Sequence, residues 1–214
     1  MGDSEKKPGR PANPELRSQR TEAILDVAAQ LFAEQGFAST DLQLIADRCG
    51  VAKGTIYHYF PNKEELFLAA VDRGLEQLNA AIDSAIADCT DILEIYRRAI
   101  VTFLKYFEQH RDLVELFLQE RALFKDRKMP AYFAMHEQKC GEWQAMHQEL
   151  IAQGRGRHLP PDNDPSIFND FLYGTIIANH VTGRQVSSEE QAAKVIDIFF
   201  HGILSESERK NNRE

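Results

Sequence analysis

TDLQLIADRCGVAKGTIYHYFPNKEEL, residues 40 to 66, is the stretch that decides the fold of this 214-residue chain. It begins with a helix of about two turns, whose apolar stripe is formed by Leu42, Ile45 and Ala46. Thr40, with Gln43 three residues later, matches an N-terminal capping pattern. A first short helix is therefore predicted to begin at about Thr40.

A turn and two further helices follow within the same stretch. Gly50 ends the first helix, because glycine tolerates the left-handed backbone conformation found at helix ends. A second short helix is predicted from about Lys53 to Tyr59, held to a core by Ile56 and Phe60. Asn62 then caps the next helix. The other side chains of residues 53 to 59 are expected to point outward.

The segment GVAKGTIYHYFPNKEEL, residues 50 to 66, resembles the helix-turn-helix signature of TetR-family bacterial transcriptional regulators. RTEAILDVAAQLFAEQGFAST, residues 20 to 40, is similar to the first helix of that family. The resemblance implies an all-α fold, with an N-terminal three-helix helix-turn-helix DNA-binding domain and a C-terminal helical ligand-binding and dimerisation domain. The rival interpretation of these residues is an ordinary helical hairpin with a tyrosine-rich surface.

The resemblance also assigns the expected contacts with double-stranded DNA. Tyrosine hydroxyls and lysines reach phosphates, whereas threonine and histidine reach groove edges. The expected DNA-binding residues are Thr40, Gln43, Lys53, Gly54, Thr55, Tyr57, His58, Tyr59 and Lys63. Ala52 stands where relatives usually place a serine, so the second helix is predicted to lack a side-chain cap.

Composition limits the other classes of protein. The formal net charge is −8, so DNA binding must depend on a few well-placed cations. Three cysteines without a CxxC pair suggest neither a disulfide framework nor a zinc ribbon, and they fit a reducing cytoplasm. No apolar run is long enough for a membrane span. Without a phosphate loop or a catalytic spacing, the chain is expected to be no enzyme and to need no cofactor.

Breaks in the pattern divide the chain into a disordered basic arm over 1–13, a DNA-binding domain over 14–62 and a helical domain over 63–214. For the arm, a solubilising tail and a segment that contacts DNA are both open interpretations. The fourth helix is predicted to extend from Asn62 to about Ile82. Later helices are predicted at about 91–109, 111–124, 129–153, 165–182 and 188–204.

One face of the helix at 129–153 suggests a cavity for a small molecule. At 100° per residue, His136, Cys140, Trp143 and His147 fall within an arc of about 60°. A purely structural face would more cheaply consist of leucine and isoleucine. The expected ligand-binding residues are Phe103, Phe107, Phe117, Glu120, Phe124, His136, Cys140, Trp143, His147 and Phe171.

Two alternatives for this face stay open. His136 and Cys140 have a plausible metal-ligand spacing, which would make the protein a metal- or redox-sensing regulator on the same scaffold. The histidines can also be ordinary core residues with satisfied hydrogen bonds. An unchanged response in Cys140→Ser would remove the sensor hypothesis.

The last two helices carry more apolar surface than one neighbour can cover. The resemblance implies that they pair with their copies in a homodimer, which presents two helix-turn-helix units to a near-palindromic operator. The expected dimerisation residues are Phe168, Leu172, Ile176, Ile196, Phe199, Phe200 and Ile203. Burial within one subunit is the alternative. The preferred function is a repressor released by a small apolar or aromatic effector, and a DNA binder without any ligand is a rival.

Overall fold

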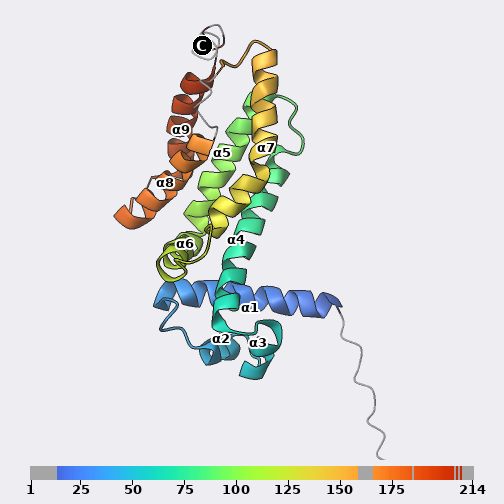
Figure 1. Cartoon of the computed structure of the whole chain (residues 1–214), viewed down its shortest axis with the longest axis vertical. Helices are drawn as coiled ribbons and strands as arrows, with labels where there is room; N and C mark the ends of the chain where they lie inside the picture. Colours follow the sequence, from blue (N-terminus) through green and yellow to red (C-terminus); the bar gives the residue numbers. More distant parts are fainter. Residues whose placement is uncertain (1–13, 159–165, 185, 205, 207, 209–214) are drawn as a thin grey trace, which may run out of the picture. The chain divides into compact units, whose positions relative to one another are not determined.

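The computed structural model describes residues 14–158, 166–184, 186–204, 206 and 208. These ranges contain nine helices and no strand, so the all-α prediction is confirmed. The helices are α1 (Pro14–Gln35), α2 (Leu42–Arg48), α3 (Lys53–Tyr59), α4 (Lys63–Ile86), α5 (Ile92–Gln109), α6 (Arg111–Leu123), α7 (Ala131–Ala152), α8 (Ser166–Thr182) and α9 (Ser188–Ile203) (Figure 1). None of them is long and apolar enough to cross a membrane. The expected basic arm, residues 1–13, lies outside the described residues.

The chain divides into two compact units, of which the first ends at Ala70 and the second begins at Val71. This boundary falls eight residues after the expected end of the DNA-binding domain. The difference arises because the start of α4 belongs to the core of the first unit. The ring of Phe67 lies 5.2 Å from that of Phe32 and 5.5 Å from that of Phe37, and Phe32 and Phe67 are fully buried.

Two glycines lie at helix ends of the first unit, and Gly50 ends a helix as the sequence predicts. Gly36, which follows α1, and Gly50, between α2 and α3, have φ angles of 80° and 65°. Side chains other than glycine rarely adopt this region. The turn at Gly50 brings α3 against α2, and Ile56 is the side chain that α3 buries. The helix-turn-helix geometry therefore depends on the turn at Gly50 and on the burial of Ile56.

In the second unit, α5 packs along α9, and α6 contacts both α5 and α8. A core cluster joins α5, α7 and α9 through Ile92, Leu93, Tyr96, Leu150, Phe200 and Leu204. Asp91 caps the start of α5, because its carboxylate accepts a hydrogen bond from the backbone N–H of Glu94. This frame positions one face of α7 opposite α8 and α9, where a cavity lies.

Candidate functional sites

The exposed face of α3 holds most of the residues expected to contact DNA. Tyr57 is 49% exposed, and His58 and Gly54 are also exposed, whereas Lys53, Thr55 and Tyr59 are half-buried. A Cβ placed on Gly54 would meet no protein atom within 4 Å. The first turn of α3 is thus open to an approaching partner. α3 has Ala52 as its N-cap and no side-chain cap bond, as predicted.

The capping prediction for α2 is wrong. Asp41 caps this helix, because its carboxylate accepts a 2.8 Å hydrogen bond from the backbone N–H of Gln43. Thr40 is 2% exposed, and its hydroxyl lies 3.2 Å and 2.8 Å from the carbonyl oxygens of Leu31 and Gly36. The Thr40 side chain is therefore a structural link to the end of α1 and is absent from the exposed surface. Gln43 remains exposed, as expected.

The cations near α3 are held by neighbouring groups of the same unit. Lys53 Nζ lies 2.9 Å from the Asp41 carboxylate. This hydrogen bond raises the pKa of Lys53, whereas the pKa of Asp41 is lowered first by its bond to the Gln43 N–H and then by Lys53. Lys63 Nζ donates to the carbonyl oxygen of Ala38 at 3.0 Å, and partial burial lowers its pKa. Both cations are thereby held by residues 38–41, which precede α2.

Removing the α2 cap is expected to destabilise the first unit. Asp41→Ala leaves the N–H of Gln43 without its acceptor, so the free energy of unfolding should fall by about 1 kcal/mol. Chemical denaturation followed by circular dichroism measures this change. Asp41→Asn is the matched control, since it keeps an accepting oxygen and loses only the charge. If it costs as much as Asp41→Ala, the stabilisation comes from the ion pair with Lys53 instead.

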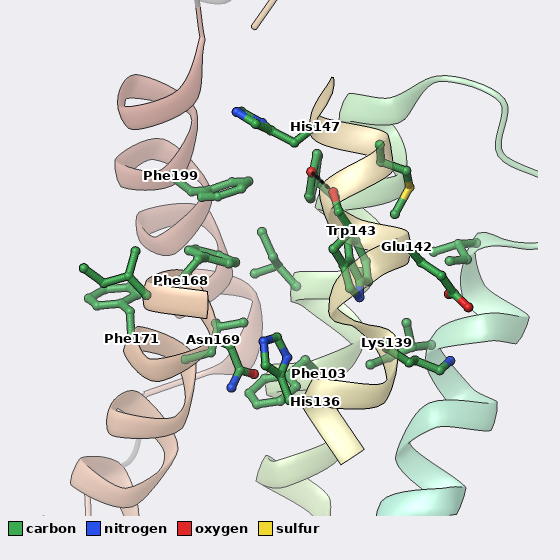
Figure 2. A pocket seen from close by; sticks show the side chains of 18 of the residues that line it. Phe103, His136, Lys139, Glu142, Trp143, His147, Phe168, Asn169, Phe171 and Phe199 are labelled. Carbon is green, nitrogen blue, oxygen red and sulfur yellow. Dashed lines mark hydrogen bonds between the residues drawn. The ribbon is translucent and has the colours of Figure 1, made fainter. Parts of the chain in front are cut away.

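The second unit contains a partly open cavity of about 400 Å³, lined by residues of α4, α5, α7, α8 and α9 (Figure 2). Its wall is mostly apolar, and α4 contributes Leu78, Ile82 and Ile86 at intervals of four residues. Five of the ten residues expected to bind a ligand line it, namely Phe103, His136, Trp143, His147 and Phe171. The predicted face of α7 is thus brought to the cavity through three of its four residues.

Cys140 is the member of that face that does not line the cavity. By the geometry of an α-helix, Cys140 lies about 40° around the helix axis from His136, whereas Trp143 and His147 each lie within about 20° of His136. The Cys140 sulfur accepts a hydrogen bond of 3.3 Å from Gln144. Among the described residues, no group of three or more His, Cys, Asp and Glu side chains is placed to hold a metal ion.

The other predicted ligand residues lie elsewhere. Phe107 and Phe117 are 4% and 2% exposed and belong to an aromatic core, with their rings 5.9 Å apart. Phe124 ends α6 and is not part of the cavity wall. Glu120 is 2% exposed. Its Oε1 forms an ion pair with Nη1 of Arg127 at 2.5 Å and accepts a hydrogen bond from the backbone N–H of Ala131 at 3.0 Å. Burial raises the pKa of Glu120 despite these partners.

Few polar groups interrupt the cavity wall, and its cations are engaged. Lys139 Nζ lies 2.7 Å and 2.9 Å from the two carboxylate oxygens of Asp83. Arg157 donates to the carbonyl oxygen of Gly202. Asn169 accepts a 2.7 Å hydrogen bond from the hydroxyl of Tyr132, which is 1% exposed. No sequence pattern marks Asn169 as a cavity residue, because its position depends on the contact between α8 and α7.

His147 is 5% exposed, and burial lowers its pKa below the ordinary value of 6.5. The unfolded chain therefore takes up a proton at a higher pH than the folded protein does. The free energy of unfolding should fall as the pH drops below about 6.5, and His147→Gln should reduce this slope. Urea denaturation at a series of pH values between about 7.5 and 5 tests this, with the exposed His58→Gln as control. An equal slope in His147→Gln would contradict the assignment.

Most of the residues expected at the dimer interface are covered within their own chain. Leu172, Ile176 and Phe200 are 4% to 8% exposed and are covered within their own chain. Ile196 and Phe199 are half-buried against the core cluster, and the rings of Phe168 and Phe199, 3.9 Å apart, line the cavity. The side chain of Ile203 lies outside the described residues. Among the described residues of this region, the exposed large apolar side chains are Ile167, Phe171, Val181 and Ile198, and all but Val181 also line the cavity.

Most of the first unit matches a known protein family. Residues 24–70 match the model of bacterial regulatory proteins of the tetR family. The transcriptional activator FasR of Mycolicibacterium smegmatis is 32% identical over 43% of this chain, which spans only 42% of the length of FasR. The transcriptional repressor KstR2 of the same organism is 24% identical over 90% of this chain and 95% of its own length.

Solved structures share the fold of most of the chain. The fatty acid degradation regulator FadR from Bacillus halodurans has a TM-score of 0.73 at 19% identity, over 92% of this chain and 98% of that one. The structure of the ketosteroid transcriptional regulator KstR2 of Mycobacterium tuberculosis has a TM-score of 0.64 at 24% identity, with coverages of 87% and 96%. The prediction of a helix-turn-helix domain followed by a helical domain is thereby confirmed.

Proposed function

From its membership of the TetR family of DNA-binding transcriptional regulators, we propose that this chain is a homodimeric repressor released from a near-palindromic operator by a small apolar molecule. The observation that carries the proposal is the combination of an exposed polar α3 with a separate, mostly apolar cavity. The first feature suits a DNA groove and the second suits a small organic ligand. Repression is favoured because KstR2, a repressor, matches nearly the whole chain.

The DNA contacts are assigned to α3 and its surroundings. Tyr57 presents its hydroxyl on the exposed face, and Gly54 leaves space for close approach. Lys53 and Lys63 provide positive charge beside that face, and Lys63 also stands at the start of α4, where backbone N–H groups attract anions. Thr55, His58 and Tyr59 complete the surface, together with Gln43 of α2.

The dimer is assigned to the exposed apolar side chains of α8 and α9. Ile167, Phe171 and Val181 recur along α8 at spacings that place them on one stripe, and Ile198 lies on α9. Ile167, Phe171 and Ile198 also line the cavity, so the proposed dimer surface borders it. These side chains are 43% to 67% exposed, and such a stripe is typical of a surface that another chain covers. A two-fold symmetric dimer then presents two copies of α3 to two half-sites.

The effector is assigned to the cavity of the second unit. A volume of about 400 Å³ lies within the range of about 300 to 1,000 Å³ typical of small-molecule sites. FadR is a regulator of fatty acid degradation and KstR2 is a ketosteroid regulator. Fatty acids and ketosteroids are both largely apolar molecules. Leu78 and Ile82 line the cavity from α4, a helix that begins in the first unit, so a ligand can act on DNA binding by displacing α4.

The test is binding to DNA fragments, beginning with the region upstream of the chain's own gene, at two salt concentrations. The proposal predicts a specific, near-palindromic site whose affinity falls at the higher salt. A folded protein that binds all fragments equally, or none, would contradict it. Adding compounds to the specific complex then tests release by an effector.

A further inference from the structure

The buried polar atoms of the cavity wall that lack a hydrogen-bond partner among the described residues include Nδ2 of Asn169 and Nε2 of His147. The remaining wall is dominated by leucine, isoleucine and aromatic side chains. A buried polar group without a partner is costly, and binding sites are where such groups are most readily explained. What each atom requires defines what a ligand must supply.

The side-chain amide of Asn169 requires an acceptor. Its oxygen already accepts from the Tyr132 hydroxyl at 2.7 Å, so its Nδ2 group is left as a buried donor. An Nδ2 group can donate two hydrogen bonds and can accept none. The complementary ligand atom is therefore an oxygen with a lone pair, such as a ketone carbonyl.

The ring of His147 requires a donor. It hydrogen-bonds to the backbone of Arg157 in a contact that favours the protonated ring, so the backbone group is the accepting carbonyl. Because Nε2 has no partner, the nitrogen that donates is Nδ1. In the neutral ring Nε2 is then an acceptor, and a ligand hydroxyl would satisfy it.

The two groups lie toward different ends of the cavity. Figure 2 shows Asn169 at the level of His136, and His147 further along α7. His136 and His147 are eleven residues apart in this helix, which corresponds to about 16 Å along its axis. A ligand that meets both groups is therefore elongated.

A negative charge on the ligand is disfavoured at the Asn169 end of the cavity. Lys139 is paired there with both carboxylate oxygens of Asp83, whereas Arg157, beside His147 at the other end, donates to the neutral carbonyl of Gly202 and keeps its charge. A carboxylate buried beside Asn169 would therefore lack a compensating positive charge. The Asn169 end is suited to an uncharged carbonyl.

We propose that the cavity binds an elongated, uncharged, apolar molecule with a carbonyl oxygen that accepts from Asn169 at one end and a hydroxyl that donates to His147 at the other. This inference rests on the proposed function, because it assumes that the cavity is the effector site. It adds the chemical class of the effector and the two residues that select it.

Fluorescence of Trp143 provides a direct test that needs no DNA. Trp143 is the single tryptophan of the chain and lines the cavity. The probes share a dodecane chain: a hydroxyketone with its two groups at opposite ends, the corresponding hydroxycarboxylate, dodecan-1-ol and dodecan-2-one. The hydroxyketone should bind at least about tenfold more tightly than the hydroxycarboxylate and than either probe with a single polar group.

Two variants separate the ends of the ligand. Asn169→Asp keeps an acceptor for Tyr132 and loses the Nδ2 donor, so it should weaken the hydroxyketone and dodecan-2-one about tenfold and leave dodecan-1-ol unchanged. His147→Phe keeps a ring of similar size, so it should weaken the hydroxyketone and dodecan-1-ol about tenfold and leave dodecan-2-one unchanged. Circular dichroism and thermal melting confirm that each variant is folded.

The outcomes distinguish the inference from the proposed function. Tighter binding of the hydroxycarboxylate, or equal effects of each variant on all probes, overturns the inference and leaves the cavity as an effector site. If no probe changes the Trp143 fluorescence of the folded protein, both the inference and the assignment of the effector to this cavity fail. Operator binding, measured separately, decides the remainder of the proposed function.

Discussion

The double substitution Val181→Asp and Ile198→Glu is expected to convert the dimer into monomers and to weaken operator binding by about 10²- to 10⁴-fold. The two side chains are 67% and 60% exposed in the isolated chain, so the substitutions should be tolerated by its fold. In a symmetric dimer each substitution occurs twice at the interface, and four buried carboxylates would lack cations. A monomer binds one half-site and loses the gain from linked binding.

Sedimentation gives the oligomeric state, and fluorescence anisotropy with the full operator and with a half-site gives the affinities. Leu123→Asp is the matched control, because Leu123 is 44% exposed on α6, outside the proposed stripe. It should leave both the dimer and the operator affinity unchanged. A double variant that stays dimeric, or a monomer that binds the operator as tightly as the parent protein, would place the interface elsewhere.

The helices and their order could be predicted from the sequence because local signals specify them. Gly36 and Gly50 end helices at positive φ angles, and the apolar spacing marks the helices between such breaks. The capping residue of α2 could not be chosen in this way. Thr40 and Asp41 are both good N-cap residues, and only the burial of Thr40 against the end of α1 decides between them.

The cavity was predicted correctly where one helix defines a face and incorrectly where residue type alone was used. His136, Trp143 and His147 share a face of α7 and line the cavity. Phe107 and Phe117 are aromatic in the same way as Phe103, yet they fill the core. An aromatic side chain serves either purpose, and the neighbouring helix that covers it is chosen by tertiary packing, which the sequence pattern does not contain.

The same limit applies to the predicted dimer surface. α8 and α9 are apolar on more than one side, so the periodicity of each helix predicts two covered faces. It does not show which face is covered by another chain. Leu172, Ile176 and Phe200 turn inward in the structure. The exposed apolar side chains on the other side, such as Val181, then become the available contact surface.

The net charge of −8 makes individual contacts more important for DNA binding than they would be in a basic protein. Lys53 is shared with Asp41, and Lys63 with the carbonyl oxygen of Ala38. Uncharged donors on α3 must then supply a larger part of the affinity. The tyrosine with the greatest exposure on that helix is accordingly expected to have a large effect.

Tyr57→Ala is expected to weaken operator binding by about 10- to 100-fold, the effect of losing a hydrogen bond to a charged phosphate together with the contact of the ring. The free energy of unfolding should change by less than about 0.5 kcal/mol, because the side chain is 49% exposed. Anisotropy titrations with the operator and with unrelated DNA measure the loss. Tyr57→Phe separates the two contributions, since it removes the hydroxyl and keeps the ring. Binding by Tyr57→Ala at the parent affinity would show that the exposed face of α3 does not contact the operator through this residue.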